Sequence, residues 1–203
     1  MENKIKLKGI LKNIEPSHVI QGIEFNKANL IVSRDDGKED VLNLRFKRFS
    51  NPYTENQEVS LTGNVRSYST RLDNGKNHVE LYVFTYFDIP ELNENDQEDI
   101  NKLVIEGRIC KIEELRKTKS GKNNVHLILA NNLIVSDGSK KLNSYIPCIA
   151  WGDTAIELSK LTVNSAIKVT GSLHSREYKK TFEDGSFEIR VAHECSVKSF
   201  ELL

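Results

Sequence analysis

The chain has 203 residues and a mass of 23.1 kDa, enough for one large domain or two small ones. Its 29 basic and 29 acidic residues cancel, so the total charge gives no sign of a polyanionic partner. With 38% hydrophobic and 29% charged residues, the composition is that of a globular protein and excludes collagen-like, mucin-like and wholly disordered chains.

Residues 1–8 alternate charged and apolar side chains without an uninterrupted apolar segment. We therefore expect neither a signal peptide nor a membrane span, and a cytosolic, cytoplasmic location. The three cysteines, Cys110, Cys148 and Cys195, are widely spaced and flanked by apolar sequence. This arrangement argues against a disulfide framework and predicts reduced, mostly buried thiols.

Apolar and polar residues alternate along the chain with the period of β-strands, as in segments 5–11 and 42–46. Turn sequences separate these segments: Asp35-Asp36-Gly37, Asp73-Asn74-Gly75, Asp137-Gly138-Ser139 and Asp184-Gly185-Ser186. All four permit the positive φ angles of hairpin turns. The chain is therefore predicted to be mostly β, with mainly antiparallel strands.

Segment 90–100 interrupts this pattern because it is polar, acidic and without periodicity, which is typical of a linker. We predict an N-terminal domain over residues 1–89, an acidic linker over 90–100 and a C-terminal domain over 101–203. The linker also predicts that the two domains move relative to each other.

The two halves resemble each other in sequence. Residues 5–11 are similar to 103–109, and residues 59–65 are similar to 167–173, so a duplication is the economical explanation. The second half alone has a helical pattern, in which Ala155, Ile156, Leu158 and Leu161 suit one face and Asp153 or Thr154 suits the N-cap. In the first half a short, proline-containing loop over 50–56 takes the place of this helix.

Three strands, a short helix and two further strands in about 100 residues match the OB fold, a five-stranded Greek-key barrel. We predict an all-β protein of two tandem OB-fold barrels, the second with a short helix between its strands 3 and 4. Four glycines fall in the middle of predicted strands, where a bulge or barrel corner needs them: Gly9, Gly63, Gly107 and Gly171.

Charge is unevenly distributed, with net values of +1 for residues 1–90, −5 for 91–100 and +4 for 101–203. The basic residues of the last segment gather in three predicted loops: Arg116, Lys117, Lys119 and Lys122; Lys140 and Lys141; Lys179 and Lys180. Loops of this kind can follow a phosphate backbone, although lysines in solvated loops also serve solubility alone.

Tyr145 and Trp151 have the same parity on predicted strand 145–151, so they face one side while the small apolar residues between them face the other. Tyr178, beside Lys179 and Lys180, could join them in a platform of rings rimmed by cations. Such platforms hold single strands, because each stacked base contributes about 1 to 3 kcal/mol without reading sequence. The alternative is that the rings pack in a core or a dimer contact.

Six segments of the second half follow in order: 101–108, 114–121 (Glu-Leu-Arg-Lys-Thr-Lys-Ser-Gly), 129–132, 148–152, the predicted helix, and 171–178. In this order the half resembles the bacterial single-stranded DNA-binding protein family from end to end. The resemblance implies a non-catalytic protein that binds single-stranded DNA largely without sequence preference, in replication, repair, recombination or DNA transfer.

In that family, bases stack on aromatic side chains at positions matching Tyr145, Trp151 and Tyr178, and the barrels assemble as tetramers. Two barrels in one chain resemble the duplicated members, so we expect a homodimer that supplies four OB folds. The expected phosphate contacts of the second half are Arg116, Lys117, Lys119, Lys122, Arg176, Lys179 and Lys180. Replication or transfer proteins are possible further partners, and no membrane is involved.

The first half carries Asn43, Arg45 and Lys47 on one strand face, where the second half has its aromatic residues. Its barrel would contact phosphate through Arg45 and Lys47 without stacking, or serve for assembly. Tyr68, Tyr82 and Tyr86 are unranked stacking candidates. Family members usually end in an acidic tip that recruits partners, whereas this chain stops directly after its last predicted strand, so the usual recruitment peptide is expected to be missing.

The five histidines have no cysteine or carboxylate at metal-ligand spacing, and neither a GxxxxGK phosphate loop nor a GxSxG elbow occurs. We expect no metal, no cofactor and no enzymatic activity. Three alternatives to DNA binding stay open: a primosome-type OB accessory that contacts replication enzymes, an RNA-binding OB protein, and a protein that uses both barrels for assembly.

Overall fold

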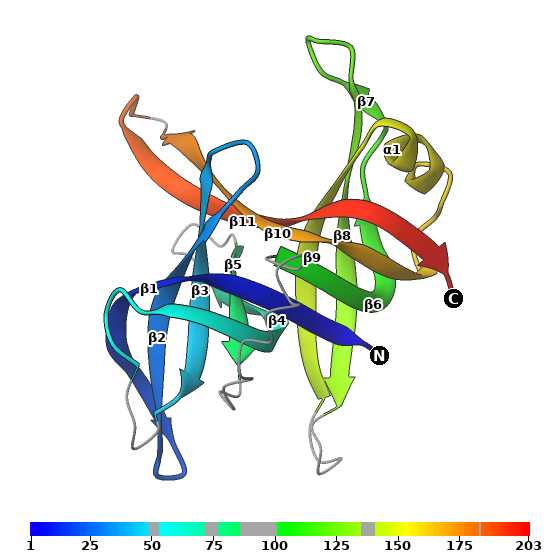
Figure 1. The fold of residues 1–203 in the computed structure, drawn as a ribbon. Helices are drawn as coiled ribbons and strands as arrows, with labels where there is room; N and C mark the ends of the chain where they lie inside the picture. The colour runs from blue at the N-terminus through cyan, green and yellow to red at the C-terminus, as the bar shows by residue number, and fades with distance from the viewer. Residues whose placement is uncertain (49–52, 72–76, 86–100, 135–140, 183) are drawn as a thin grey trace.

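The computed structural model describes residues 1–48, 53–71, 77–85, 101–134, 141–182 and 184–203, which form an almost entirely β molecule (Figure 1). The first half contains β1 (Asn3–Ile20), β2 (Ile23–Ser33), β3 (Glu39–Lys47), β4 (Glu58–Arg71) and β5 (Asn77–Thr85). The second half contains β6 (Asn101–Ile112), β7 (Arg116–Lys117), β8 (Asn123–Ile134), β9 (Lys141–Trp151), α1 (Gly152–Leu158), β10 (Ala166–Thr181) and β11 (Phe187–Leu202).

The strands of the first half close a five-stranded barrel in the order β1-β2-β3-β5-β4, with β4 pairing back onto β1. Neighbours are antiparallel except for β3 and β5, which are parallel and place Leu44 opposite Val83. Alternate residues point into the barrel, and both of these side chains are fully buried. The alternation seen in the sequence therefore encodes the inner face of the barrel.

The second half closes in the same way through β6, β8, β9, β11 and β10, with β9 and β11 as its parallel pair. The helix α1 follows the third long strand and buries Ala155 and Leu158. These observations confirm the prediction of two OB-fold barrels, the second with a helix between strands 3 and 4. Turns at 35–37 and 184–186 are confirmed by the positive φ of Gly37 and Gly185, whereas those at 73–75 and 137–139 lie outside the described residues.

The expected helix cap is wrong, because α1 begins at Gly152 and its N-cap is Trp151, which makes no side-chain capping hydrogen bond. Gly152 has a φ of 59°, so the chain turns immediately after β9 and Asp153 already lies in the first helical turn. A left-handed φ of this kind is readily available only to glycine. The ring of Trp151 is thereby fixed at the junction of strand and helix.

The mid-strand glycines lie where two strands approach closely. A Cβ on Gly63 would stand 2.6 Å from the carbonyl oxygen of Phe84, and one on Gly107 would stand 2.6 Å from that of Ala130. Both distances are shorter than any real Cβ contact, so a side chain would force the strands apart. The sequence predicted a bulge or a barrel corner at these glycines; the pairing is irregular at Gly171, between Thr170 and Gly171, and at Gly63 and Gly107 the close approach of a neighbouring strand excludes a side chain.

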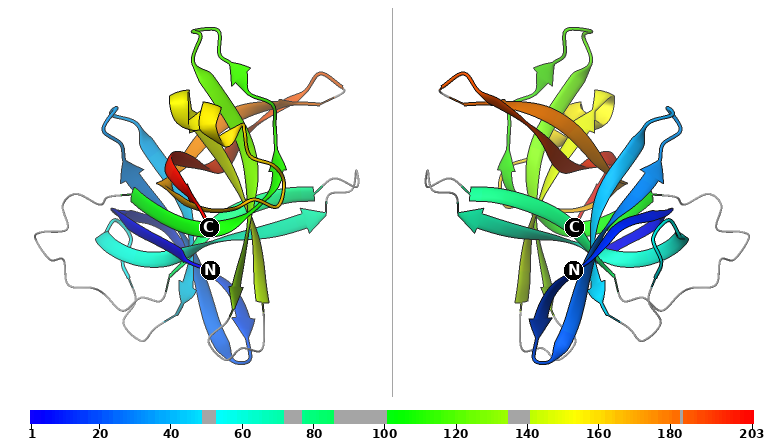
Figure 2. Two further views of the ribbon diagram at one scale, coloured as in Figure 1. Left: turned by 90° about the vertical axis from the view of Figure 1, so that its right-hand side faces the viewer. Right: turned by 90° about the vertical axis from the view of Figure 1, so that its left-hand side faces the viewer.

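The barrels are joined by pairing of β1 with β6, in which Asn3 lies opposite Ile105, Ile5 opposite Leu103 and Leu7 opposite Asn101. Because the repeats align Ile5 with Leu103, the middle pair joins equivalent residues, as in the two-fold contact of a homodimer. One 11-stranded sheet thus runs through both barrels (Figure 2). This contradicts the expected independent movement of the halves; the linker predicted at 90–100 lies outside the described residues.

Each barrel also extends a long hairpin across the other. The amide of Val41 on β3 donates to Ser175 Oγ on β10 at 2.8 Å, and the amide of Tyr145 on β9 donates to Ser67 Oγ on β4 at 2.8 Å. Ser67 and Ser175 stand at equivalent positions of the repeat. The two contacts therefore obey the same pseudo-two-fold symmetry as the β1–β6 pairing.

A buried carboxylate strengthens one of these crossings. Asp40 is fully buried; its oxygens accept hydrogen bonds from the amide of Ser175 at 2.6 Å and from Arg34 Nε at 2.8 Å, and lie 2.8 Å from His174 Nδ1. Burial alone would raise the pKa of Asp40, but the interactions with His174, Arg34 and the Ser175 amide lower that pKa to about 2. The ionised carboxylate thus ties β3 of one half to β10 of the other.

Replacing Asp40 by Asn should lower the free energy of unfolding at pH 7 by about 3 kcal/mol, because Arg34 loses its buried ionic partner. The folded pKa of Asp40 is below the unfolded value of about 3.9, so its contribution is complete above about pH 5 and is lost progressively as the pH falls through the folded pKa of about 2. Urea unfolding at pH 7 and at pH 2.5 measures this. An equal difference between Asp40→Asn and the parent at both pH values would contradict it.

Candidate nucleic-acid interface

The outer face of β9 carries Tyr145 and Trp151, as their parity predicted. Ile146, Cys148 and Ala150 point inward and are at most 1% exposed, whereas Tyr145 is 48% exposed and Trp151 is half-buried. Tyr145 therefore does not pack in a core in the described part of the chain. Both rings are placed to meet a ligand that approaches the barrel from outside.

Tyr145 and Trp151 stand at the two ends of a strip. Six residues of extended strand separate them by roughly 20 Å. Between them lie Pro147 and Ile149, which face the same side, and the neighbouring β8 adds Ile128 opposite Pro147. The arrangement is an apolar strip with an aromatic ring at each end, in which Pro147 and Ile128 are half-buried and Ile149 is only 6% exposed.

The β7–β8 hairpin supplies cations next to Trp151. Lys122 Nζ lies 5.3 Å from the centre of the Trp151 ring, within the range of a cation–π contact. Lys117 and Lys119 are exposed on the same hairpin, and among the described residues neither forms an ion pair. This corner of the molecule therefore combines one flat ring with three uncompensated positive charges.

Arg116 shares its charge with a nearby carboxylate. Its Nη2 lies 3.4 Å from Glu113, whose own pKa is lowered by a hydrogen bond from Lys111 and by the charge of Arg116. Glu113 therefore stays ionised and offsets part of the local positive charge. Among the residues predicted to contact phosphate in this hairpin, Arg116 is the one already engaged.

Tyr178 lies on another arm of the molecule. It is half-buried on the β10–β11 hairpin, opposite Arg190 and with the guanidinium of Arg176 6.0 Å from its ring centre. This hairpin crosses the first barrel, and in Figure 1 its tip points away from the tip of the β7–β8 hairpin. The structure therefore does not bring Tyr178 into one platform with Trp151.

The other predicted cations of this hairpin also lie on different faces. Arg176 pairs with Glu194 at 3.2 Å, and Lys180 is exposed on the same face. Lys179 points to the opposite face, where its Nζ lies 3.8 Å from the centre of the Phe187 ring. The sequence cluster of Tyr178, Lys179 and Lys180 is thus divided by the alternation of the strand.

In the first half, Arg45 and Lys47 are half-buried on the outer face of β3, as predicted. The guanidinium of Arg45 lies 4.4 Å from the ring centre of Tyr82 and 5.7 Å from that of Tyr68, which is 52% exposed. Tyr86 lies outside the described residues. Arg45 therefore lies beside two tyrosine rings, and the three residues form a mixed cationic and aromatic surface.

Sequence reasoning missed a further group of rings in this half. His18 stacks on Phe25 at 4.7 Å, Phe25 lies 6.2 Å from Phe84, and Arg66 lies 4.0 Å from the Phe84 ring centre. The register places Phe25 opposite Lys47, and Phe84 beside Arg45. Phe25 and Phe84 lie on the same barrel face as Lys47 and Arg45. Strand alternation could have indicated this face once the pairing of the strands was known. The rings of Phe25 and Phe84 thus add to the tyrosines that the sequence offered as unranked stacking candidates.

Metal ligands, cysteines and a membrane-spanning helix are the other features that bear on function in the described residues. No group of three or more His, Cys, Asp or Glu side chains there is placed to hold a metal ion. Cys148 and Cys195 are buried as expected, but Cys110 is exposed because it lies at an irregularity in the β6–β8 pairing. The helix in this part of the chain, α1, falls far short of the length that crossing a bilayer requires.

Comparison with known proteins gives consistent results. The model of the single-strand binding protein family matches residues 100–203. A single-stranded DNA-binding protein from Staphylococcus epidermidis is 28% identical over 82 residues, which cover 40% of this chain and 63% of that protein. The chain thus spans less than two thirds of this relative.

Solved structures extend the likeness of the fold to both barrels. The wild-type single-stranded DNA binding protein from Thermus aquaticus superposes with a TM-score of 0.71 at 18% identity, covering 100% of this chain and 93% of that one. A deletion mutant of the same protein gives a TM-score of 0.71 at 18% identity, with 100% and 94% coverage. The arrangement of two joined barrels therefore has a solved counterpart.

Proposed function

Because this chain belongs to the single-strand binding protein family, we propose that it binds single-stranded DNA by base stacking and phosphate neutralisation, largely without sequence preference. It would act on strands exposed in replication, repair, recombination or DNA transfer. The chain would divide into a divergent N-terminal OB domain over residues 1–89, an acidic linker over 90–100 and a C-terminal OB domain over 101–203 that resembles single-stranded DNA-binding proteins.

The observation that carries this proposal is the position of Trp151. Its ring is partly open to solvent on the outer face of a barrel and lies beside Lys122, at the base of a hairpin rich in unpaired lysines. A base stacked on the ring would bring its own phosphate close to these cations. Stacking is tolerant of base identity, because every base presents a flat π face.

The remaining predicted residues suggest a path longer than one base. Tyr145 stands at the far end of the β9 strip, Tyr178 on the β10–β11 hairpin, and Arg45 between two tyrosines on the first barrel. A strand that followed these residues would pass from one barrel to the other. The path accounts for the distribution of basic residues over several arms of the molecule.

Titration with oligo-dT should quench the fluorescence of Trp151, the one tryptophan of the chain, and added salt should reverse the binding. Trp151→Ala should bind about tenfold more weakly, since one stacked base contributes about 1 to 3 kcal/mol. Trp151→Phe is the matched control and should retain most of the affinity. Equal binding by Trp151→Ala and the parent would refute the stacking role, and preferential binding of matched RNA would refute the choice of polymer.

We also propose that two chains associate into a homodimer with four OB folds. One face of the β10–β11 hairpin carries Phe187, Ile189 and Val191, which are 58%, 54% and 43% exposed. Contiguous exposed apolar residues of this kind mark interaction surfaces. Sedimentation equilibrium at micromolar concentration should give twice the chain mass of 23.1 kDa. A single species of 23.1 kDa would eliminate the homodimer.

A further inference from the structure

Rings and cationic groups share the outer face of the first barrel, across β2, β3, β5 and β4. Alternate residues of these strands point outward, and directly opposite residues of neighbouring antiparallel strands share a face. The register pairs residue 25 with 47 and residue 66 with 82. We call the following outward residues the ring face: Phe25, Arg45, Lys47, Arg66, Tyr68 and Tyr82.

Both guanidinium groups of the ring face lie over aromatic rings. That of Arg45 lies 4.4 Å from the ring centre of Tyr82 and 5.7 Å from that of Tyr68. That of Arg66 lies 4.0 Å from the ring centre of Phe84, which is only 8% exposed. A planar guanidinium that is backed by a ring keeps its other side for a base and its N–H groups for a phosphate.

The positive charges of the ring face lack counter-ions. In the described part of the chain, no carboxylate forms an ion pair with Arg45, Lys47 or Arg66. Glu15, on the adjoining part of β1, is already paired with Lys27 at 3.0 Å. Arg66 Nε is buried without a hydrogen-bond partner, so the Phe84 ring, and not an acceptor, holds this guanidinium. An anion that approaches such an arginine gains the full attraction of its charge.

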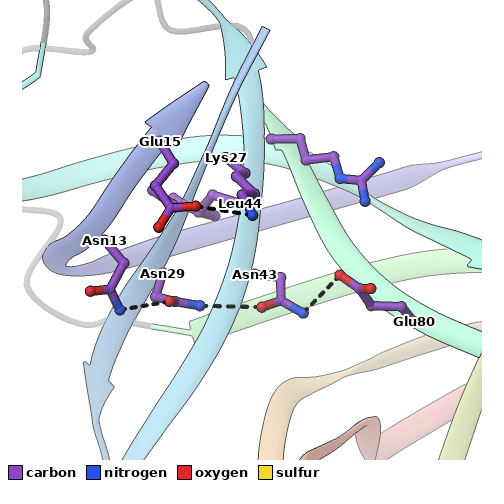
Figure 3. A pocket seen from close by; sticks show the side chains of 9 residues that line it. Asn13, Glu15, Lys27, Asn29, Asn43, Leu44 and Glu80 are labelled. Atoms are coloured by element: carbon purple, nitrogen blue, oxygen red, sulfur yellow. Dashed lines mark hydrogen bonds and ion pairs between the residues drawn. The ribbon is translucent and has the colours of Figure 1, made fainter. Parts of the chain in front are cut away.

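A ladder of side-chain amides borders the ring face and ends on a carboxylate (Figure 3). Asn13 Nδ2 donates to Asn29 Oδ1 at 3.0 Å, and Asn29 Nδ2 donates to Asn43 Oδ1 at 3.2 Å. Asn43 Nδ2 donates in turn to Glu80 Oε1 at 3.4 Å. The one charge of Glu80 offsets at most one of the cations of the ring face. A positive surplus therefore remains beside the rings, and it attracts a phosphate backbone.

The ring face is not a copy of the candidate interface on the second barrel. The parallel pairs align β3 with β9, so that Lys47 takes the position of Trp151 and Val41 takes that of Tyr145. Neither residue of the first barrel is aromatic. Its rings lie instead on β2, β4 and β5, the neighbours of β3 in the sheet. Transfer of residues along the repeat would therefore miss this surface.

The ring of Tyr68 is turned away from the second barrel. Its neighbour Ser67 faces β9, where the Ser67 Oγ accepts a hydrogen bond from the amide of Tyr145 at 2.8 Å. Successive residues of a strand point to opposite faces, so Tyr68 lies on the side away from this contact and towards Arg45. Tyr68 is 52% exposed, which leaves its ring open to a base.

We propose, on the basis of the DNA binding proposed above, that the ring face is a second stacking site for single-stranded DNA. Bases stack on the ring of Tyr68 and on the open side of the Arg45 guanidinium, while Lys47 and Arg66 neutralise the adjoining phosphates. The first barrel thus stacks bases through its own residues instead of contacting phosphate alone. It does so separately from Trp151, so one chain holds a strand at two stacking sites.

The test titrates the full chain with labelled oligo-dT and follows the anisotropy of the label together with the fluorescence of Trp151. Tyr68→Ala should bind about tenfold more weakly, because one stacked base is lost. Its quench of Trp151 at saturation should equal that of the parent, because the second barrel is unchanged. Tyr68→Phe is the matched variant that keeps the ring, and it should retain most of the affinity. Urea unfolding checks that both variants fold.

A second substitution separates stacking from charge. Arg45→Lys keeps the positive charge but removes the flat surface, so it should bind about threefold more weakly with an unchanged dependence on salt. Lys47→Ala removes a phosphate contact and should reduce the slope of log affinity against log salt by about one. An affinity of Arg45→Lys equal to that of the parent would overturn stacking on this guanidinium.

The outcomes separate this site from the proposed function. Equal binding by Tyr68→Ala and the parent, with weaker binding by Trp151→Ala, would overturn the second stacking site and leave DNA binding by the second barrel intact. A loss of affinity that Tyr68→Phe shares would assign the effect to the hydroxyl group and would also overturn stacking. Failure of the parent to bind oligo-dT would refute the proposed function, and the ring face with it.

Discussion

The pairing of β1 with β6 is the interaction on which the rest of the structure depends. A barrel strand with an unpaired edge exposes a row of amide and carbonyl groups, and in each half this edge is satisfied by the equivalent strand of the other half. The pairing fixes the orientation of the barrels, and the orientation decides where each long hairpin crosses. The Ser67 and Ser175 contacts, and the buried Asp40, are possible only in that orientation.

The joined barrels also explain why the candidate interface is spread over the molecule. Trp151 and its lysines lie on the second barrel, whereas the β10–β11 hairpin carries Tyr178 and Arg176 across the first. The outer face of the first barrel, with Arg45 and the hydrogen-bonded side chains of Asn29 and Asn43, continues towards the other face of this hairpin, since Asn43, Val191 and His193 line one groove. The duplicated sequence thus carries different chemistry on the outer faces of its two barrels.

The inward and outward faces of the strands and the family of the second half could be predicted from the sequence, because both depend on local sequence patterns. Strand alternation placed Tyr145 outward and Cys148 inward, and the mid-strand glycines were recognised as special positions, although the structure explains Gly107 by the close approach of Ala130. The ordered motifs of the second half indicated the family that its model confirms. The first half offered fewer family motifs, and its barrel followed from the repeat.

The features that could not be predicted depend on pairing between distant strands. Phe25, Phe84 and Arg66 come together because β2, β3, β5 and β4 are neighbours in space, and the ladder of Asn13, Asn29 and Asn43 requires the registers of three strands. The position of Tyr178 required knowledge of which barrel its hairpin crosses. The rigid junction was missed because an acidic, aperiodic segment gives no sign of strand pairing elsewhere in the chain.

Photochemical crosslinking with peptide mapping measures most directly whether bases stack on the second barrel. An oligonucleotide carrying 5-iodouracil forms a covalent bond with an aromatic side chain that lies against the base. The account predicts crosslinks at Trp151 and at Tyr145, with the Trp151 adduct reduced by rising salt. Crosslinks confined to peptides remote from the outer face of β9, at a salt concentration where the strand is bound, would contradict it.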